Sequence, residues 1–461
     1  MEAILTKFPL PRYPKVKVKA TDEELMQIAR YLANAKEYKS NKVGFSAYGK
    51  TTAGDKVLFA AENLIDSRII ESITAALKEK GATVDKLIID VGKERDIEEE
   101  DEIDFFIGRP GVHEPEMYKR LLVQWIYDLA EQRKMDLLIQ GSGGPSAKGV
   151  KRHAGIPWSS VETFVAETTT FPSELNEIIN RVTWNMIWDK GRGGKVHLTD
   201  PEGTDLNFTL FEKYYDRPNS YGFAKEPRMG HLFCHPVQPI IEEADDKGVL
   251  AGTSNHVGKP FPPIKVFIDR GVVTKIEGGG KYGEQWRGLL EETRDVQYPG
   301  HPRPGMFYLW EIALGTHPKA HRPTNFHKRS AWAAFWERYR SGYIHVGLGT
   351  CLEEIYPDSD VWAKKNGKIY GHVHIHLLFP TYEITTKDGE KIKVIEKGHL
   401  TALDHPDVRK AAAKYGDPDK ILSEIWIPGI PGVNTSGNYN QDYAKDPTAY
   451  MKEELKKYTI V

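Results

Sequence analysis

The sequence is poor in cysteine and contains no long apolar segment. Only two cysteines, Cys234 and Cys351, occur among 461 residues, which excludes a disulfide framework and is typical of a protein of the reducing cytoplasm. No segment reaches the roughly 18 apolar residues that a transmembrane helix requires. The first residues also lack the apolar run of a signal peptide. We therefore expect a cytoplasmic protein with no membrane partner.

The chain also lacks an excess of charge of either sign. It has 63 Lys and Arg residues against 65 Asp and Glu residues, which gives a formal net charge of −2. Proteins that bind nucleic acids carry clustered basic residues, and no such stripe stands out here, so we expect no nucleic-acid partner. The 40% of hydrophobic and 28% of charged residues indicate an ordinary globular protein. Its length suggests two or three domains.

The first 190 residues alternate short apolar runs with amphipathic segments. The apolar runs predict buried strands, at residues 56–61, 85–92 and 136–140. Apolar residues at helical spacing predict helices between them and after them, at residues 69–81, 117–129 and 172–189. Strands that alternate with helices at this spacing indicate a mostly parallel sheet covered by helices. We therefore predict an α/β N-terminal domain, residues 1–190.

The pattern changes after Gly194. β-branched residues alternate with polar ones around glycine-containing turns, which predicts hairpins at residues 195–210, 264–280 and 382–398. Helices are predicted between these hairpins, at residues 282–295 and 331–340. We therefore predict an α+β, sheet-rich C-terminal domain, residues 191–461, and we place the metal site described below in it.

The histidines are concentrated in the second half of the chain. Eleven of the 16 lie between His231 and His376, and imidazole is a common ligand of borderline transition metals. The segment GHVHIHLLFP places His372, His374 and His376 at every second position of an apolar strand, and therefore on one face. Three buried histidines on one face are difficult to satisfy by hydrogen bonds alone. We therefore predict that this strand binds a metal ion.

Two further apolar segments each carry one polar residue. Glu311 lies in YLWEIALGTHP, and His345 lies in SGYIHVGLGT. A buried, unpaired carboxylate is costly, so Glu311 either meets a cation or is protonated. His345 taken alone is more often a hydrogen-bonded core histidine than a metal ligand.

Taken in order, these segments resemble the aminopeptidase T-type metallopeptidases and their relatives, the 2,5-dihydroxypyridine dioxygenases. TDPEGTDLNFTL (199–210) looks like the glycine–threonine–aspartate–leucine strand of that family. WEIALGT, YIHVGLG and HIHLLFP are similar to segments that carry metal ligands, and they place ligands at Glu311, His345 and His374. MGHLFCHP is similar to a further ligand segment, in which His231 stands where the family has a glutamate.

Two carboxylate ligands of the family pattern are histidines in this chain. His231 replaces the glutamate, and His376 replaces the aspartate of the histidine–x–aspartate motif. A two-metal peptidase site depends on bridging carboxylates, so the loss of two anions favours one ion over two. We expect a single divalent ion, with Mn²⁺ first and Fe²⁺ or Zn²⁺ as alternatives. The residues expected to hold it are His231, Glu311, His345, His374 and His376.

A looser resemblance is to the dihydrophloroglucinol cyclohydrolases, Mn²⁺-dependent enzymes that open a cyclic diketone. It implies a hydrolase in which metal-activated water cleaves a carbon–carbon bond of a small cyclic substrate, as in aromatic degradation. His256 or His317 is expected to act as general acid or base. The alternatives are a non-haem Fe(II) ring-cleaving dioxygenase, an aminopeptidase and a non-catalytic metal-binding protein. The family resemblance also implies a homodimer.

Overall fold

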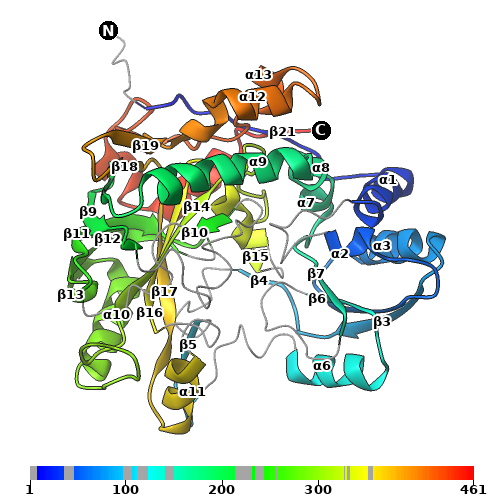
Figure 1. Ribbon diagram of the computed structural model, residues 1–461, viewed down its shortest axis with the longest axis horizontal. Helices are drawn as coiled ribbons and strands as arrows, with labels where there is room; N and C mark the ends of the chain where they lie inside the picture. Colours follow the sequence, from blue (N-terminus) through cyan, green and yellow to red (C-terminus); the bar gives the residue numbers. More distant parts are fainter. Residues whose placement is uncertain are drawn as a thin grey trace.

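Two sheets dominate the computed structural model, a smaller one of four strands and a larger one of 13. Figure 1 shows the smaller sheet and its blue and cyan helices beside the larger sheet, whose strands run from green to orange apart from one short strand of the N-terminal half. Within the described part of the chain, no helix is long and apolar enough to cross a membrane. The structure describes residues 8–35, 46–96, 106–112, 123–140, 150–212, 231–233, 243–255, 258–326, 328–329, 333–350 and 357–461.

The smaller sheet is parallel. Strand β2 (Lys56–Glu62) lies between β3 (Thr83–Ile89) and β6 (Leu137–Gln140), and β7 (Arg152–Gly155) pairs with β6. Each of these pairings is parallel. The predicted parallel sheet is therefore confirmed, and its three predicted strands lie within a few residues of their expected bounds.

Helices cover both faces of the smaller sheet. Helices α1 (Asp22–Ala33) and α3 (Ser67–Glu79) share one core with Val57 and Phe59 of β2. The intervening side chains of β2 pack in a second core with α6 (Val123–Gln132) on the opposite face. Successive residues of a strand point to opposite faces, so an apolar run without alternation is what a strand covered on both sides requires.

The larger sheet is antiparallel throughout. Its strand order is β20-β19-β18-β8-β9-β11-β12-β13-β14-β16-β17-β5, and β10 also pairs with β14. The strands are β5 (Ile107–Gly108), β8 (Lys195–Asp200), β9 (Thr204–Thr209), β10 (His231–Phe233), β11 (Lys247–Ser254), β12 (Pro260–Asp269), β13 (Val272–Gly278), β14 (Tyr308–Gly315), β16 (Ile344–Gly349), β17 (Tyr370–Leu377), β18 (Thr381–Thr385), β19 (Lys391–Glu396) and β20 (His399–Leu400).

The predicted elements of the second half are present. The three predicted hairpins correspond to the pairs β8–β9, β12–β13 and β18–β19. The predicted helices correspond to α10 (Gly280–Thr293) and to a 3₁₀ helix, η4 (Ala333–Tyr339). Helix α9 (Ser173–Trp184) continues as a π-helix to Lys190 and crosses the upper edge of the larger sheet in Figure 1. The sheet-rich C-terminal half is therefore confirmed.

One short strand crosses the predicted division of the chain. Strand β5 belongs to the first 190 residues, yet its Ile107 and Gly108 pair with Gly371 and Tyr370 of β17, at the edge of the larger sheet. The boundary near residue 190 stays a prediction. The crossing nevertheless places a segment of the N-terminal half next to the histidine-bearing strand.

Candidate metal centre

Three adjacent strands near one edge of the larger sheet carry the predicted ligands. Strand β16 lies between β14 and β17, and Gly347 of β16 pairs with Glu311 on one side and with His374 on the other. The three residues therefore form one row across the sheet. A β-carbon at Gly347 would lie 2.9 Å from the Glu311 Oε2 atom. The glycine therefore leaves the space through which the carboxylate of Glu311 reaches towards His374.

Glu311, His345 and His374 bring one oxygen and two nitrogens together. The Glu311 Oε2 atom lies 3.1 Å from His374 Nε2 and 3.3 Å from His345 Nε2. The three ligand atoms all lie within 4.8 Å of one another, and all three residues are buried. A carboxylate and two imidazoles suit Mn²⁺, Fe²⁺ and Zn²⁺. This buried group can therefore hold a divalent metal ion.

Burial keeps the two histidines of the group in the form that binds metals. It lowers the pKa of His345 well below its ordinary value, and the neighbouring His376 and Arg338 lower it further. Burial also lowers the pKa of His374 well below the usual range, and only the Glu311 carboxylate works against this. Both imidazoles are therefore neutral near pH 7, and a neutral imidazole nitrogen is a metal ligand.

His376 contacts Nδ1 of His345, the ring nitrogen that does not face the Glu311 carboxylate. The two histidines pair directly across β16 and β17, and His376 Nε2 lies 2.8 Å from His345 Nδ1. The other ring nitrogen of His376 lies 2.9 Å from the Tyr343 hydroxyl. Both nitrogens of His376 thus face protein groups. The structure groups Glu311, His345 and His374, and it places His376 as a hydrogen-bond partner of one of them.

A buried anion lies at the far end of this chain of contacts. The Tyr343 hydroxyl lies 2.6 Å from Glu337 Oε1, and Arg322 Nε lies 2.5 Å from Glu337 Oε2. Burial raises the pKa of Glu337, but Arg322 and His376 outweigh it and bring that pKa down to about 2. The motif analysis missed both Glu337 and Tyr343. The available signals were a charged residue inside the aromatic segment AAFWERY and a tyrosine two positions before His345 on one strand.

Two of the remaining predicted residues, His231 and His317, lie on other segments of the described chain. Strand β10 pairs with β14 so that His231 stands opposite Gly315, four residues along the strand from Glu311, or roughly 13 Å. The side chain of His231 and all of His256 lie outside the described residues. His317 is buried, accepts a hydrogen bond from the backbone of Lys319 and packs on Phe171. Burial lowers its pKa to about 3.

A further histidine and a tryptophan adjoin the group. His372 packs on Trp310 with ring centroids 5.1 Å apart, and on His374 at 4.8 Å. Phe106, which precedes β5, contacts both histidines. His372 Nδ1 and Trp310 Nε1 are buried and have no hydrogen-bond partner among the described residues. Burial lowers the pKa of His372 to about 4, so that it too is neutral.

No protein-family model matches the sequence, and no curated protein matches it either. The fold is similar to that of a solved structure, the 2,5-dihydroxypyridine dioxygenase of Pseudomonas putida KT2440. That alignment has a TM-score of 0.52 at 15% identity and covers 83% of this chain and 98% of the other. A second structure, AmpT of Thermus thermophilus, aligns with a TM-score of 0.43 at 14% identity over 83% and 100% of the two chains.

Proposed function

We propose that this chain is an enzyme that depends on a divalent metal ion and opens a small cyclic diketone by hydrolysis. The observation that carries the proposal is the buried group of Glu311, His345 and His374. Its residues come from three strands and from positions up to 63 apart in sequence. Three donors leave positions on the ion for a substrate and a water, as in catalytic rather than structural metal sites.

The proposed reaction consumes one water and needs no oxidant. An ion in this site would polarise a substrate carbonyl and lower the pKa of water. The hydroxyl of the water adds to one ring carbonyl carbon, and the bond from this carbon to the ring CH₂ that the two carbonyls share breaks. The electron pair of that bond leaves as the enolate of the second carbonyl, which takes up the remaining proton. The product is an open-chain keto acid.

Two buried polar atoms beside the group favour an oxygenated ring as substrate. Trp310 Nε1 is a donor, and His372 Nδ1 is a donor or an acceptor according to its tautomer. Buried polar atoms without a partner need an explanation. Trp286 and Trp426 also have such an atom among the described residues, so the argument rests on the contact between His372 and Trp310 beside His374. Ring oxygens of a substrate would satisfy both atoms.

The test begins with the metal content of the purified protein. The metal-free protein is then loaded with Mn²⁺, Fe²⁺ or Zn²⁺ and assayed on a cyclic 1,3-diketone and on 2,5-dihydroxypyridine, with and without oxygen. We expect about one ion per chain and oxygen-independent opening of the diketone. Glu311→Gln, which keeps the size of the side chain and removes its charge, should lose both the ion and the activity. Retention of a full complement of metal by this variant would refute the site.

A second candidate function is oxidative ring cleavage. Two histidines and one carboxylate are also the ligands of ferrous oxygenases, and the fold is shared with a 2,5-dihydroxypyridine dioxygenase. Iron in the purified protein together with oxygen consumption on the dihydroxypyridine would favour this reaction over hydrolysis. Peptide cleavage ranks lower, because bridging carboxylates hold the metal pairs of two-metal sites, and Glu311 is the one carboxylate in the described group.

A further inference from the structure

We propose that Glu337 is a positioning residue that sets the tautomer of the metal ligand His345 through Tyr343 and His376. Three hydrogen-bond contacts link the four residues one after another, from Glu337 to Tyr343, from Tyr343 to His376 and from His376 to His345. The proposal rests on the metal centre of the proposed function, but it does not depend on which reaction occurs there. Each contact fixes the direction of the next one, and a longer direct contact of 3.4 Å between His376 Nδ1 and Glu337 Oε1 favours the same direction.

The direction is set at the anionic end. Glu337 is 1% exposed at its side chain, and its Oε2 atom accepts from Arg322 Nε at 2.5 Å. A guanidinium only donates hydrogen bonds, and an ionised carboxylate only accepts them. The buried pair therefore presents Oε1 as an acceptor to the Tyr343 hydroxyl. Tyr343 must therefore donate its single hydroxyl proton to Glu337.

The remaining contacts follow in order. Since the Tyr343 proton goes to Glu337, its oxygen is an acceptor for His376, whose Nδ1 atom lies 2.9 Å away. A neutral imidazole has one N–H and one lone pair, so His376 with a proton on Nδ1 presents a lone pair at Nε2. That lone pair accepts from His345 Nδ1 at 2.8 Å. His345 is thereby held with its proton on Nδ1 and its lone pair on Nε2.

This tautomer is the one that a metal ion requires. The Nε2 atom of His345 faces the Glu311 Oε2 atom at 3.3 Å, so a lone pair points at a carboxylate oxygen. Such an arrangement is favourable when a cation lies between the two atoms. Hydrogen bonds that orient metal-bound histidines are known to tune metal affinity. The relay here is longer than usual, since two groups separate the carboxylate from the ligand.

The variant Glu337→Gln tests the direction of the relay. Its carbonyl oxygen must face Arg322, so its amide N–H₂ faces Tyr343 and donates to it. Tyr343 then donates to His376, and His376 donates from Nε2 to His345. His345 consequently carries its proton on Nε2, where the ion should bind. We expect a loss of Mn²⁺ affinity of about 10- to 100-fold, measured by calorimetric titration of the metal-free protein.

Two control variants separate this reversal from general damage. Tyr343→Phe removes a link, but His376 Nδ1 lies 3.4 Å from Glu337 Oε1 and can donate to it directly, so we expect a loss of less than about tenfold. Glu454→Gln removes another buried carboxylate, whose partners are Tyr13 and the backbone of Gly429, and it should leave Mn²⁺ affinity unchanged. Equal affinities for Glu337→Gln and wild type would refute the relay.

A spectroscopic measurement tests the tautomer without the metal. In metal-free protein labelled with ¹⁵N at histidine, NMR distinguishes an Nδ1–H from an Nε2–H tautomer, and His345→Gln assigns the signals. We expect His345 as Nδ1–H in the wild type and as Nε2–H in Glu337→Gln. An Nε2–H tautomer in the wild type would overturn the relay. Failure of the wild type to bind Mn²⁺, Fe²⁺ or Zn²⁺ would instead overturn the proposed function, while the tautomer measurement still decides on the relay.

Discussion

The absence of a side chain at residue 347 is as important to the metal centre as the ligands are. Gly347 stands between Glu311 and His374 in the sheet register. A β-carbon at Gly347 would come within 2.9 Å of both the β-carbon and the Oε2 atom of Glu311. Real β-carbons do not make such contacts with well-packed atoms. The carboxylate and a side chain at residue 347 therefore exclude each other.

Gly347→Ala should consequently disable the metal centre without unfolding the protein. The added methyl displaces the Glu311 carboxylate from His374 and His345, and we expect Mn²⁺ affinity to fall by more than about tenfold, as seen when metal ligands lose their orientation. Gly288→Ala is the matched control, because the nearest atom to a β-carbon there is 3.8 Å away. It should retain wild-type affinity. Calorimetric titration with Mn²⁺ measures both, and wild-type affinity in Gly347→Ala would contradict the geometry.

Trp310 provides a test of the substrate side of the site. Trp310→Phe removes the Nε1 donor and retains an aromatic ring. Loss of one hydrogen bond of about 1 kcal/mol should raise KM for the cyclic diketone about fivefold, with Mn²⁺ affinity unchanged. Trp286→Phe, at a core position that packs on Tyr282 and Phe307, should leave KM as it is. Steady-state kinetics of the two variants measure both KM values. An unchanged KM for Trp310→Phe would show that Trp310 does not contact the substrate.

At the scale of the element, one strand gives neighbouring histidines different roles. His374 and His376 share a face of β17, but His374 stands opposite Gly347 and His376 stands opposite His345. The glycine opens the space in which His374 meets Glu311. At the equivalent position opposite His376, the His345 side chain fills the space and forms a hydrogen bond with His376. The residue across the sheet, rather than the strand itself, therefore decides which imidazole reaches the carboxylate.

This explains what could be predicted from the sequence and what could not. Alternation along residues 372–376 predicts a common face because it is a property of one strand. Glu311 and His345 stood out because each is a polar residue in an apolar run. Glu337 belongs to a 3₁₀ helix, and its contacts with Tyr343 and His376 depend on the tertiary arrangement. No periodicity in the sequence encodes such a contact.

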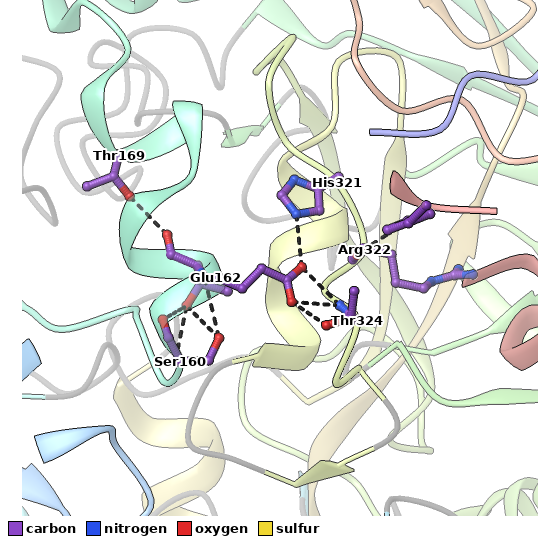
Figure 2. Close-up of polar contacts among 8 residues, drawn as sticks. Ser160, Glu162, Thr169, His321, Arg322 and Thr324 are labelled. Atoms are coloured by element: carbon purple, nitrogen blue, oxygen red, sulfur yellow. Dashed lines mark hydrogen bonds and ion pairs between the residues drawn. The ribbon is translucent and has the colours of Figure 1, made fainter. Parts of the chain in front are cut away.

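A short helix of the N-terminal half is fixed to the segment that follows β14. Figure 2 shows Glu162 of α7 (Val161–Val165) pointing towards His321 and Thr324. Its Oε1 atom accepts from the Thr324 backbone at 3.0 Å and lies 3.2 Å from His321 Nε2, and its Oε2 atom accepts from the Thr324 hydroxyl. The side chains of Glu162 and His321 are each 4% exposed. One carboxylate therefore contacts the buried His321 ring and the partly buried Thr324 of a segment distant in sequence.

Glu162→Ala should destabilise the protein by about 1–3 kcal/mol, because it removes the acceptor of the partly buried Thr324 backbone N–H and hydroxyl and the partner of the buried His321 ring. The free energy of unfolding from urea titration of the metal-free protein measures the effect. Glu284→Ala is the control, because Glu284 is exposed on α10, and its change should stay within about 0.5 kcal/mol. Equal stability of the two variants would show that Glu162 does not hold α7 to this segment.

At the scale of the whole molecule, a pair of acidic residues makes the stability of the fold depend on pH. Asp200 is the last residue of β8, and Glu202 lies in the turn between β8 and β9. The Glu202 Oε1 atom accepts from the hydroxyls of Thr253 and Tyr439, both at 2.8 Å, and its Oε2 atom is buried without a partner among the described residues. Burial raises the pKa of Glu202 to about 8, and the charge of Asp200 adds to the effect. The folded protein therefore holds a proton on Glu202 at neutral pH.

The buried histidines, whose pKa values are lowered, make the metal-free protein more stable as the pH rises towards 6.5. Glu202 acts in the opposite direction, and its contribution to stability should fall as the pH rises from about 4.3, the ordinary pKa of a glutamate in the unfolded chain, to about 8. In this window the unfolded chain releases the proton while the folded protein retains it, so the unfolded state binds fewer protons and is favoured by rising pH. Below the window the contribution is fully present, and above it the contribution is lost. Glu202→Gln cannot ionise, so the free energy of unfolding of the wild type should fall relative to that of Glu202→Gln across this window.

Urea titrations at pH 5, 6, 7 and 8 measure this slope for the wild type, for Glu202→Gln and for Glu284→Gln, which alters an exposed carboxylate and should retain the wild-type slope. The metal-free protein is required because metal binding has a pH dependence of its own. A wild-type slope in Glu202→Gln would mean that another group holds the proton. A fall of wild-type stability relative to Glu202→Gln would show that a site far along the sheet from Glu311 contributes to how the fold responds to pH.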